Sequence, residues 1–273
     1  MNIRVSEGVK GFKQKAIEIW GVKDWDGKDE SELLFFGLYF PEDYQALKDF
    51  KGSKSIFWCG SDILRTMRNP EYQAIVEEEG IKHYCENEAE EINLKSIGIT
   101  PEVIPSFLGS VYSYPVSFKR PRIGEFWKLW LCAHPQREGE YGVHEAIELT
   151  KLYSNLQIHI YGIDGESSEQ VIYHGKVSEE QLDKEIRDYH CGFRANFHDG
   201  VSEVIMKSLF LGQYPIARLK YEGVMSYSNW DELVNCIEEL FKQVEPNLKT
   251  RCIWIKKVNS FPWSKQQFWN ANE

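Results

Sequence analysis

The chain has 273 residues, of which 42% are hydrophobic and 14% are aromatic. This length and composition predict a globular protein with two domains, each with its own core, and exclude a disordered chain. The formal net charge is −10, which argues against a non-specific nucleic-acid binder because neutralising phosphates requires a basic face. The basic cluster of Lys119, Arg120 and Arg122 is too small to reverse that expectation.

No segment reaches the roughly 18 apolar residues that a membrane span needs, and the N-terminal sequence has no apolar signal-peptide region. We therefore expect a soluble, cytoplasmic protein without a transmembrane segment. The six cysteines contain no C-x-x-C pair, which predicts reduced core residues. The histidines show no H-x-x-x-H spacing, so we expect no metal site.

In the first half, strands are predicted at residues 2–5, 32–39, 54–58, 82–85 and 102–106, with helices between them. Pro41 suits the first turn of one such helix, and Gly98 follows the last periodic residue of another. Alternation of strands and helices predicts a mostly parallel sheet.

The pattern restarts in the second half, with strands predicted at residues 126–132, 156–161, 170–173, 189–195, 214–218 and 252–256. Between the halves, residues 107–124 contain glycines and prolines without clear periodicity and are predicted to be a crossover rather than part of a core. The fold class is therefore α/β, with one domain at 1–110 and a second at 111–273. The aromatic tail at 261–269 is expected to pack back on the body, and specifically on the first domain.

The stretch at 193–216, FRANFHDGVSEVIMKSLFLGQYPI, has the order loop, helix, strand. Asp199, Gly200, Val201 and Ser202 form a turn with a helix N-cap, and Gly212 stands where the helix stops. Backbone N–H groups at such a helix start suit a diphosphate. An ordinary capped helix is the alternative interpretation.

Several motifs in collinear order carry a family resemblance. D-G-V-S and K-S-L-F-L-G resemble an E-G-F-G turn and an E-A-M-x-x-G helix, while LWLCAHPQREGEYGV at 129–143 resembles a strand, polar loop and helix. HIYG, YHGKV and CENEAEEINLKSIGITPEVIPSF extend the match over most of 82–217. The pattern resembles glycosyltransferases of the GT-B fold, the family 4-like group. This implies two Rossmann-like domains facing across a cleft, the second of which holds a nucleotide sugar.

The resemblance implies roles for individual residues. Arg137 falls where the family has an arginine that neutralises the donor diphosphate, whereas Tyr141 replaces the partner lysine. Lys207 or Arg194 is a candidate for the missing charge, and Gly162 matches a glycine at a strand end that we assign to the donor site.

The family's paired glutamates, eight positions apart, appear here as Asp199 and Lys207. Glu203, one helical turn before Lys207, is a candidate to replace the missing carboxylate. The alternative is a surface i,i+4 ion pair between the two.

In the first half, Asp62 follows a predicted strand and is a candidate to contact an acceptor hydroxyl or a donor sugar, or else an ordinary helix N-cap. Asp24-Trp25-Asp26 spells D-x-D but is assigned to a solvated turn. His134, His174 and His198 are expected in loops after strands.

These patterns predict a metal-independent glycosyltransferase, acting on hexosyl or related groups, that moves a sugar from a nucleotide diphosphate sugar to a glycan, lipid or other acceptor. No cofactor is expected, and the resemblance implies retention of anomeric configuration. A nucleotide-sugar epimerase and a non-catalytic sugar-nucleotide or glycan-binding protein are the alternatives. Base, sugar, acceptor and oligomeric state are left open. Neither G-x-G-x-x-G nor G-x-x-x-x-G-K-[ST] occurs, which disfavours dehydrogenase and P-loop functions.

Overall fold

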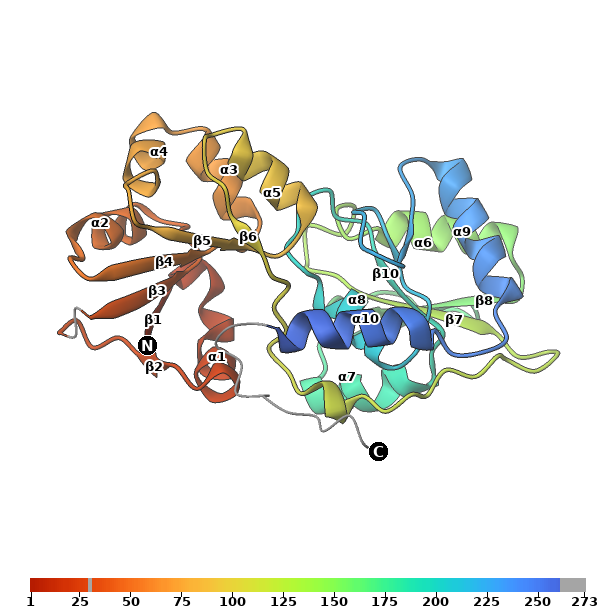
Figure 1. The fold of residues 1–273 in the computed structure, drawn as a ribbon. Helices are drawn as coiled ribbons and strands as arrows, with labels where there is room; N and C mark the ends of the chain where they lie inside the picture. Colours follow the sequence, from red (N-terminus) through yellow and green to blue (C-terminus); the bar gives the residue numbers. More distant parts are fainter. Residues whose placement is uncertain (29–30, 261–273) are drawn as a thin grey trace. The chain divides into compact units, whose positions relative to one another are not determined.

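The structure is a computed structural model that describes residues 1–28 and 31–260 (Figure 1). Its contacts divide the chain into two compact units. Among the described residues, unit 1 contains residues 1–28, 31–110, 198–201 and 256–260, and unit 2 contains residues 111–197 and 202–255. The segment 198–201 belongs to unit 1 although unit 2 precedes and follows it in sequence. The sequence did not indicate this.

Unit 1 is built on a parallel sheet, which in the described residues has six strands in the order β2-β1-β3-β4-β5-β6. The strands are β1 (Asn2–Val5), β2 (Lys23–Asp24), β3 (Glu32–Phe36), β4 (Ser53–Phe57), β5 (Lys82–Cys85) and β6 (Glu102–Val103). Apolar residues alternate between the two faces of β3: Leu33 and Phe35 enter one core, while Leu34 and Phe36 enter the other. Burial of both faces is characteristic of a parallel sheet between helical layers.

Helices cover both faces of this sheet. Four of them contribute to the core beneath Leu33 and Phe35, namely α2 (Pro41–Asp49), α3 (Ser61–Met67), α4 (Pro70–Val76) and α5 (Glu88–Lys95). The opposite face packs against α1 (Lys13–Trp20), whose Trp20 contacts Phe36 and Phe57 edge-on. A short 3₁₀ helix, Glu7–Phe12, precedes α1.

Unit 2 has a second parallel sheet, in the order β12-β11-β10-β7-β8-β9 among the described residues. Its strands are β7 (Trp127–Cys132), β8 (Leu156–Tyr161), β9 (Val171–Gly175), β10 (Cys191–Arg194), β11 (Ile216–Ala217) and β12 (Met225–Ser226). The order reverses between β10 and β7, because the chain continues outward from β7 to β9 in one direction and from β10 to β12 in the other.

One face of this sheet packs against α6 (Val143–Leu152) and α9 (Trp230–Lys242). Helix α8 (Glu203–Phe210) packs against β10, and Figure 1 shows α7 (Glu179–Glu185) below the sheet. The helix starts follow local sequence: Ser178 accepts from the Gln181 N–H and Asn229 from the Glu232 N–H, as N-cap side chains do. The strands and helices confirm the predicted α/β class.

Two predictions from the sequence, for residues 252–256 and for residues 107–124, were wrong. Residues 252–256 lie within helix α10 (Leu248–Asn259), not in a strand. Residues 107–124 are not only a crossover, because Leu108 is part of the core of unit 1 and Phe118 is part of the core of unit 2. The predicted docking of residues 261–269 lies outside the described residues.

In the described part of the chain, no helix combines the length and apolar character needed to cross a membrane. The cysteines are free thiols, of which Cys85, Cys191 and Cys236 are buried.

Candidate functional site

The carboxyl ends of β7 and β10 form the candidate site in unit 2. They flank the point where the strand order reverses, and such points are where open α/β sheets bind ligands. Arg194 is the last residue of β10, and Arg137 lies in the loop that follows β7. The structure therefore brings together two cations that the sequence placed 57 positions apart.

Tyr141 links these two arginines. The Arg194 guanidinium carbon lies 4.4 Å from the Tyr141 ring centroid, and the Arg137 guanidinium carbon lies 5.6 Å from it. Both distances fall within the range of cation–π attraction. Tyr141 thus holds two guanidinium groups close to one ring, which concentrates positive charge at this edge of the sheet.

Arg137 already has one anionic neighbour. Its Nε donates to Glu140 Oε2 at 3.0 Å, and its Nη2 forms an ion pair with the same oxygen. Both side chains are half exposed, at 52% and 58%. An exposed pair of this kind contributes little stability, so the guanidinium is able to exchange Glu140 for a doubly charged phosphate group at small cost.

Close backbone packing explains two glycines beside these arginines. Gly162, at the end of β8, has φ 91°, and a Cβ there would overlap the Ala133 carbonyl oxygen. Gly142 opens α6 with φ 81°, and its Cβ would lie 2.6 Å from the Phe193 ring. Gly162 was predicted to be a donor-site residue; the structure gives it a role in spacing the strand ends.

Asn196 lies just past the end of β10 and is buried, and its Oδ1 has no hydrogen-bond partner in the part of the chain that the structure describes. A buried unpaired oxygen is costly unless a ligand or water satisfies it. Nearby, Arg218 Nε donates to the Ala195 carbonyl at 3.1 Å. This bond fixes the backbone from which Asn196 projects. Sequence reasoning missed Asn196, because a single asparagine in a loop gives no signal.

The predicted diphosphate turn, residues 198–201, packs within unit 1. Glu86 Oε2 accepts from the Val201 N–H at 2.9 Å, and Asn87 Nδ2 donates to the Asp199 carbonyl at 2.9 Å. Gly60 approaches so closely that an added Cβ would lie 3.3 Å from the Gly200 nitrogen. The Val201 amide, one of those assigned to a diphosphate, is therefore already engaged by a carboxylate.

Three buried carboxylates surround this turn and the loop before α3. Burial raises the pKa of Asp62 to about 6. Burial also raises the pKa of Glu86 and that of Glu90, and repulsion from Glu86 raises the pKa of Glu90 further. Glu90 Oε1 is buried without a partner among the described residues. Both carboxyl groups therefore hold their protons to a higher pH than an exposed glutamate does.

Asp62 is completely buried and does not reach the surface. Its carboxylate accepts from the backbone N–H groups of Leu38, Cys59 and Ile63 at 3.0 to 3.2 Å. It therefore ties the loop after β3 to the loop after β4. The helix N-cap is Gly60 instead, and the contacts of Asp62 assign it a positioning role rather than direct contact with an acceptor.

Lys207 is 2% exposed and is surrounded by carboxylates of unit 2. Its Nζ lies 2.8 Å from Asp183, 3.1 Å from Glu179 and 3.8 Å from Glu203. Burial lowers the pKa of Lys207, but Glu203, Tyr114 and Asp183 together raise it by more, so its net shift is upward. Its charge is thus neutralised inside the unit. Glu203 and Lys207 form the i,i+4 ion pair of the alternative interpretation, but the pair is not a surface pair because Lys207 is buried.

Ser202 is the N-cap residue of α8 and is buried, but its hydroxyl forms no capping bond. Its carbonyl begins the helix by accepting from the Met206 N–H at 3.0 Å. The prediction of a helix start at this residue is confirmed.

The loop histidines differ from expectation in one case. His174 lies inside β9, not in a loop, and its ring stacks on Tyr161 with centroids 4.2 Å apart.

Asp24 lies in β2 and pairs with Lys13 at 2.8 Å, and Asp26 accepts from the Lys28 N–H. Residues 1–28 and 31–260 contain no group of three or more His, Cys, Asp or Glu side chains that could hold a metal ion.

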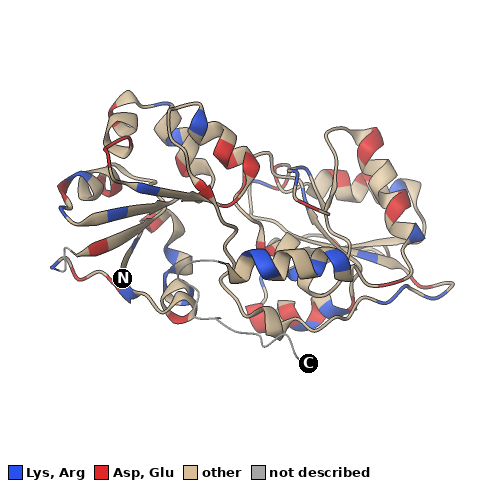
Figure 2. Cartoon of the chain, viewed as in Figure 1, with Lys and Arg blue, Asp and Glu red and all other residues tan. Residues whose placement is uncertain are grey.

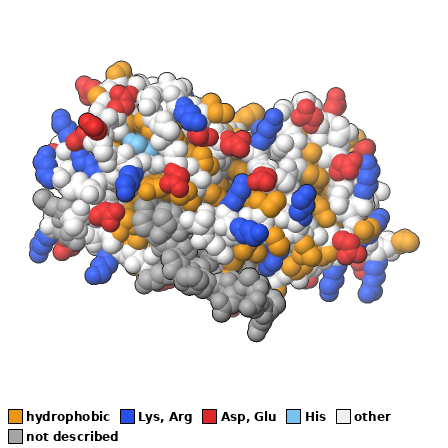
Figure 3. Space-filling model, in the orientation of Figure 1, with side chains coloured by type: hydrophobic (Ala, Val, Ile, Leu, Met, Phe, Trp, Pro, Cys, Tyr) orange, Lys and Arg blue, Asp and Glu red, His pale blue; other side chains and the backbone are white. Residues whose placement is uncertain are grey.

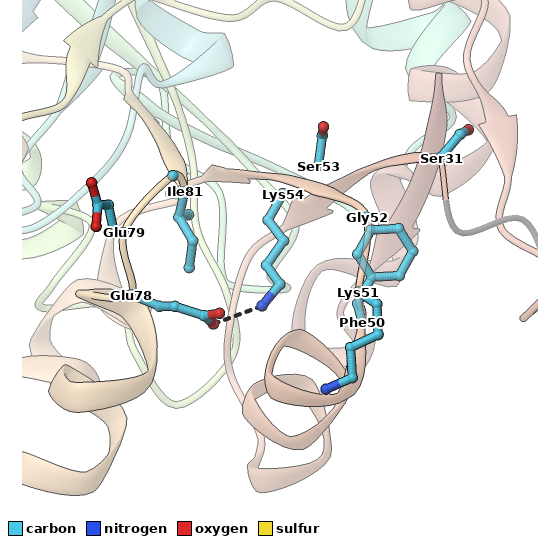
Figure 4. Close-up of a pocket in the computed structure, with 10 residues that line it drawn as sticks. Ser31, Phe50, Lys51, Gly52, Ser53, Lys54, Glu78, Glu79 and Ile81 are labelled. Carbon is cyan, nitrogen blue, oxygen red and sulfur yellow. Dashed lines mark hydrogen bonds and ion pairs between the residues drawn. The ribbon is translucent and has the colours of Figure 1, made fainter.

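Two of the cavities that the described residues form lie in unit 1. One, of about 470 Å³, lies at the carboxyl ends of β1 and β2, and its lining includes Arg4, Lys13, Asp24 and Asp43. The other, of about 520 Å³, lies at the amino end of β4, where Figure 4 shows Lys54 directed at Glu78 with 2.6 Å between Nζ and Oε2. Strand polarity makes the first the better candidate for ligand binding.

The fold was compared with solved structures. The galactosyltransferase WaaB of the lipopolysaccharide outer core matches with a TM-score of 0.60 over 96% of this chain and 97% of its own, at 11% identity. Sucrose-phosphate synthase from Thermosynechococcus elongatus matches with a TM-score of 0.63 over 92% of this chain and 73% of its own, at 13% identity. The fold is that of the GT-B glycosyltransferases.

S. aureus TarM, in a complex containing UDP, shares the GT-B fold with a TM-score of 0.58 at 13% identity over 84% of this chain. The chain spans only 53% of that TarM chain and 56% of the pneumococcal O-GlcNAc transferase GtfA. No protein-family model and no curated protein matches the sequence. At these identities the likeness establishes the GT-B fold alone.

Proposed function

We propose that this protein is a glycosyltransferase that moves a sugar, hexosyl or related, from a nucleotide diphosphate sugar to a glycan, lipid or other acceptor. The observation that carries the proposal is the pair of guanidinium groups, Arg137 and Arg194, at the strand-order reversal of unit 2. A GT-B fold that matches a galactosyltransferase over nearly the full length of both chains supports it.

In the transfer, the bond between the anomeric carbon and the diphosphate oxygen breaks, and the diphosphate leaves with the electron pair. The acceptor hydroxyl oxygen forms the new bond to the anomeric carbon, and its proton passes to the departing diphosphate oxygen. Arg137 and Arg194 stabilise the negative charge that grows on the leaving diphosphate. We propose that this charge stabilisation makes a divalent metal unnecessary and that transfer retains the anomeric configuration.

A uridine diphosphate sugar is the donor that we propose. The structures of TarM and GtfA, which share this fold, contain UDP. Asn196, whose Oδ1 is buried and unpaired among the described residues, is placed to accept from a donor N–H or hydroxyl at the same edge of the sheet.

Binding of a UDP-sugar to single-residue variants tests the donor site. Arg137→Ala and Arg194→Ala are each expected to raise Kd about tenfold or more, because a charge-assisted bond to phosphate contributes about 1.5–3 kcal/mol. Asp24→Ala, Asp26→Ala and Lys151→Ala are the controls and are expected to bind as the wild type does. The donor assignment is wrong if the arginine variants bind normally, and metal independence is wrong if a chelator abolishes turnover.

A non-catalytic sugar-nucleotide-binding protein is the second candidate, favoured by the neutralisation of Lys207 within an acidic cluster. Binding of a UDP-sugar without release of UDP, across a panel of acceptors, would support it. Lys207→Met tests whether this lysine contacts the donor or has only a structural role. If the role is only structural, the folded variant keeps the donor Kd of the wild type, and its free energy of unfolding falls by about 2–4 kcal/mol. Product analysis without an acceptor detects an epimerase.

A further inference from the structure

Unit 2 contains a cavity of about 820 Å³ at the amino-terminal edge of its sheet. Its lining includes Lys128 near the start of β7, Gln157 near the start of β8, and Tyr189 and His190 just before β10. The six residues of β7 span about 20 Å, and Arg137 and Arg194 lie at the opposite edge. The cavity is therefore separate from the proposed donor site.

The lining is basic. Five cationic side chains face two carboxylates, Glu125 and Asp188, in a chain whose net charge is −10. The cations are Lys119, Arg120, Arg122, Lys128 and Arg187. Figure 2 shows Lys and Arg along the loop before β7, at the right of the view. Figure 3, in the same orientation, shows Lys and Arg side chains on the surface at the right.

These cations keep their charge available for a ligand. Among residues 1–28 and 31–260, no ion pair joins any of the five to a carboxylate. Lys54 in the cavity of Figure 4 contrasts with them, because it is already neutralised by Glu78. A cluster of unneutralised cations raises the local positive potential and attracts anions.

Two uncharged side chains also line the cavity or border it, Ser117 and His190. Ser117 Oγ is buried and has no hydrogen-bond partner in the described part of the chain. The His190 ring is uncharged at neutral pH, because burial lowers its pKa to about 4, and its Nδ1 accepts from the Lys128 N–H at 2.8 Å. The charge of the cavity therefore comes from lysine and arginine and persists throughout the neutral range.

We propose that this cavity is a second anion site, which binds a phosphate-bearing ligand independently of the nucleotide sugar. Guanidinium groups match two phosphate oxygens at once, and Ser117 supplies a hydroxyl donor. The volume lies within the range of small-molecule sites. The phosphate belongs either to a soluble phosphorylated molecule or to a lipid headgroup. Ile123, an apolar residue that is fully exposed on the same loop, is the reason for including the lipid source in the test.

Calorimetric titration of the full chain with inorganic pyrophosphate tests the site. Arg120→Ala/Arg122→Ala is expected to weaken binding about tenfold or more relative to the wild type. Lys151→Ala/Lys184→Ala removes the same charge from exposed positions of unit 2 outside the cavity and is the matched control. Arg137→Ala is titrated in parallel, and binding at the cavity persists in it because the two sites are separate.

Vesicles of phosphatidylcholine with and without phosphatidylglycerol distinguish the sources of phosphate. Cosedimentation with the anionic vesicles alone, lost in Arg120→Ala/Arg122→Ala, assigns the lipid headgroup, whereas pyrophosphate binding without cosedimentation assigns a soluble ligand. The proposal is overturned if neither probe binds, or if the double variant binds both as the matched control does. Loss of pyrophosphate binding in Arg137→Ala alone would also overturn it, because that result places the anion at the donor site.

Discussion

At the scale of single residues, the Glu86 carboxylate holds the turn at residues 198–201 in unit 1 by hydrogen bonding. Glu86 accepts from the Val201 N–H and also from the Ser106 N–H and hydroxyl. No local sequence pattern singles out Glu86, because its partners lie 20 and 115 positions away. A glutamate in an acidic run is ordinarily solvated, and only the fold reveals that this one is buried.

Gly200→Ala tests this packing. An added Cβ would overlap Glu86 Oε2, so the turn or the carboxylate must move. We expect the free energy of unfolding to fall by about 1–3 kcal/mol, measured by urea denaturation. Gly11→Ala is the control, because a Cβ there meets nothing within 4 Å and its φ is not positive. Equal stability of the two variants would show that the turn does not pack against Glu86.

The buried carboxylates also predict a pH dependence. The pKa of Asp62 rises from 3.8 to about 6 on folding, so the folded state holds this proton more tightly than the unfolded state. Its contribution to stability is present below pH 3.8 and is lost as pH rises towards 6. The change amounts to about 1–3 kcal/mol.

The measurement is the difference in unfolding free energy between wild type and Asp62→Asn from pH 4 to pH 7. The pH dependence of the wild-type stability alone is not diagnostic, because burial also lowers the pKa of three histidines, His83, His159 and His190. Protonation of these histidines at acidic pH destabilises the folded state and opposes the effect of Asp62. The difference should favour the wild type most at the acidic end. A difference that is flat with pH would contradict a raised pKa for Asp62.

At the scale of secondary-structure elements, sequence periodicity predicted most of both sheets. Strands β1, β5 and β8 have the predicted bounds, and in β1 and β8 polar and apolar residues alternate as in a strand. Strands β2 and β12 were missed, since each has two residues and no period to detect. The candidate site was less predictable: Arg137 and Arg194 came from the resemblance, but their shared ring and the internal pairing of Lys207 depend on contacts distant in sequence.

Helix α10 shows why one strand prediction failed. The sequence Cys252-Ile253-Trp254-Ile255-Lys256 is rich in β-branched and aromatic residues, which favours a strand locally. Within the described part of α10, however, Trp254 and Val258 are buried, four positions apart. That spacing places both on one face of a helix, so tertiary packing overrides the local preference.

Trp254→Ala tests this register. Trp254 is 3% exposed, and its indole N–H donates to the Glu222 carbonyl at 2.8 Å. We expect the substitution to lower the free energy of unfolding by about 3–5 kcal/mol. Cys252→Ala, on the exposed face of the helix, is expected to change it by less than about 0.5 kcal/mol. Comparable losses for both variants would indicate that positions 252 and 254 share a buried face, as in a strand.

At the scale of the whole molecule, charge is distributed unevenly over a chain that is acidic overall. Figure 2 shows Lys and Arg interspersed with Asp and Glu along most of the chain. The two edges of the sheet in unit 2 are the exceptions: one bears Arg137 and Arg194, and the other bears the basic cavity. An acidic protein attracts anions only at such places, so both proposals make local charge the determinant of ligand binding.

Thermal denaturation with nucleotide sugars tests this view for the donor edge. A ligand that binds only the folded protein stabilises it by about 2.7 kcal/mol at a concentration of 100 times Kd. We expect the Tm to rise with one class among UDP-, GDP-, ADP- and dTDP-sugars, and to rise less for Arg137→Ala and Arg194→Ala at the same ligand concentration. Arg120→Ala/Arg122→Ala should retain the full shift, because its substitutions lie at the opposite edge of the sheet. If the cavity variant lost the shift and the Arg137 and Arg194 variants kept it, the nucleotide sugar would bind at the amino-terminal edge, and the assignment of the two sites would have to be exchanged.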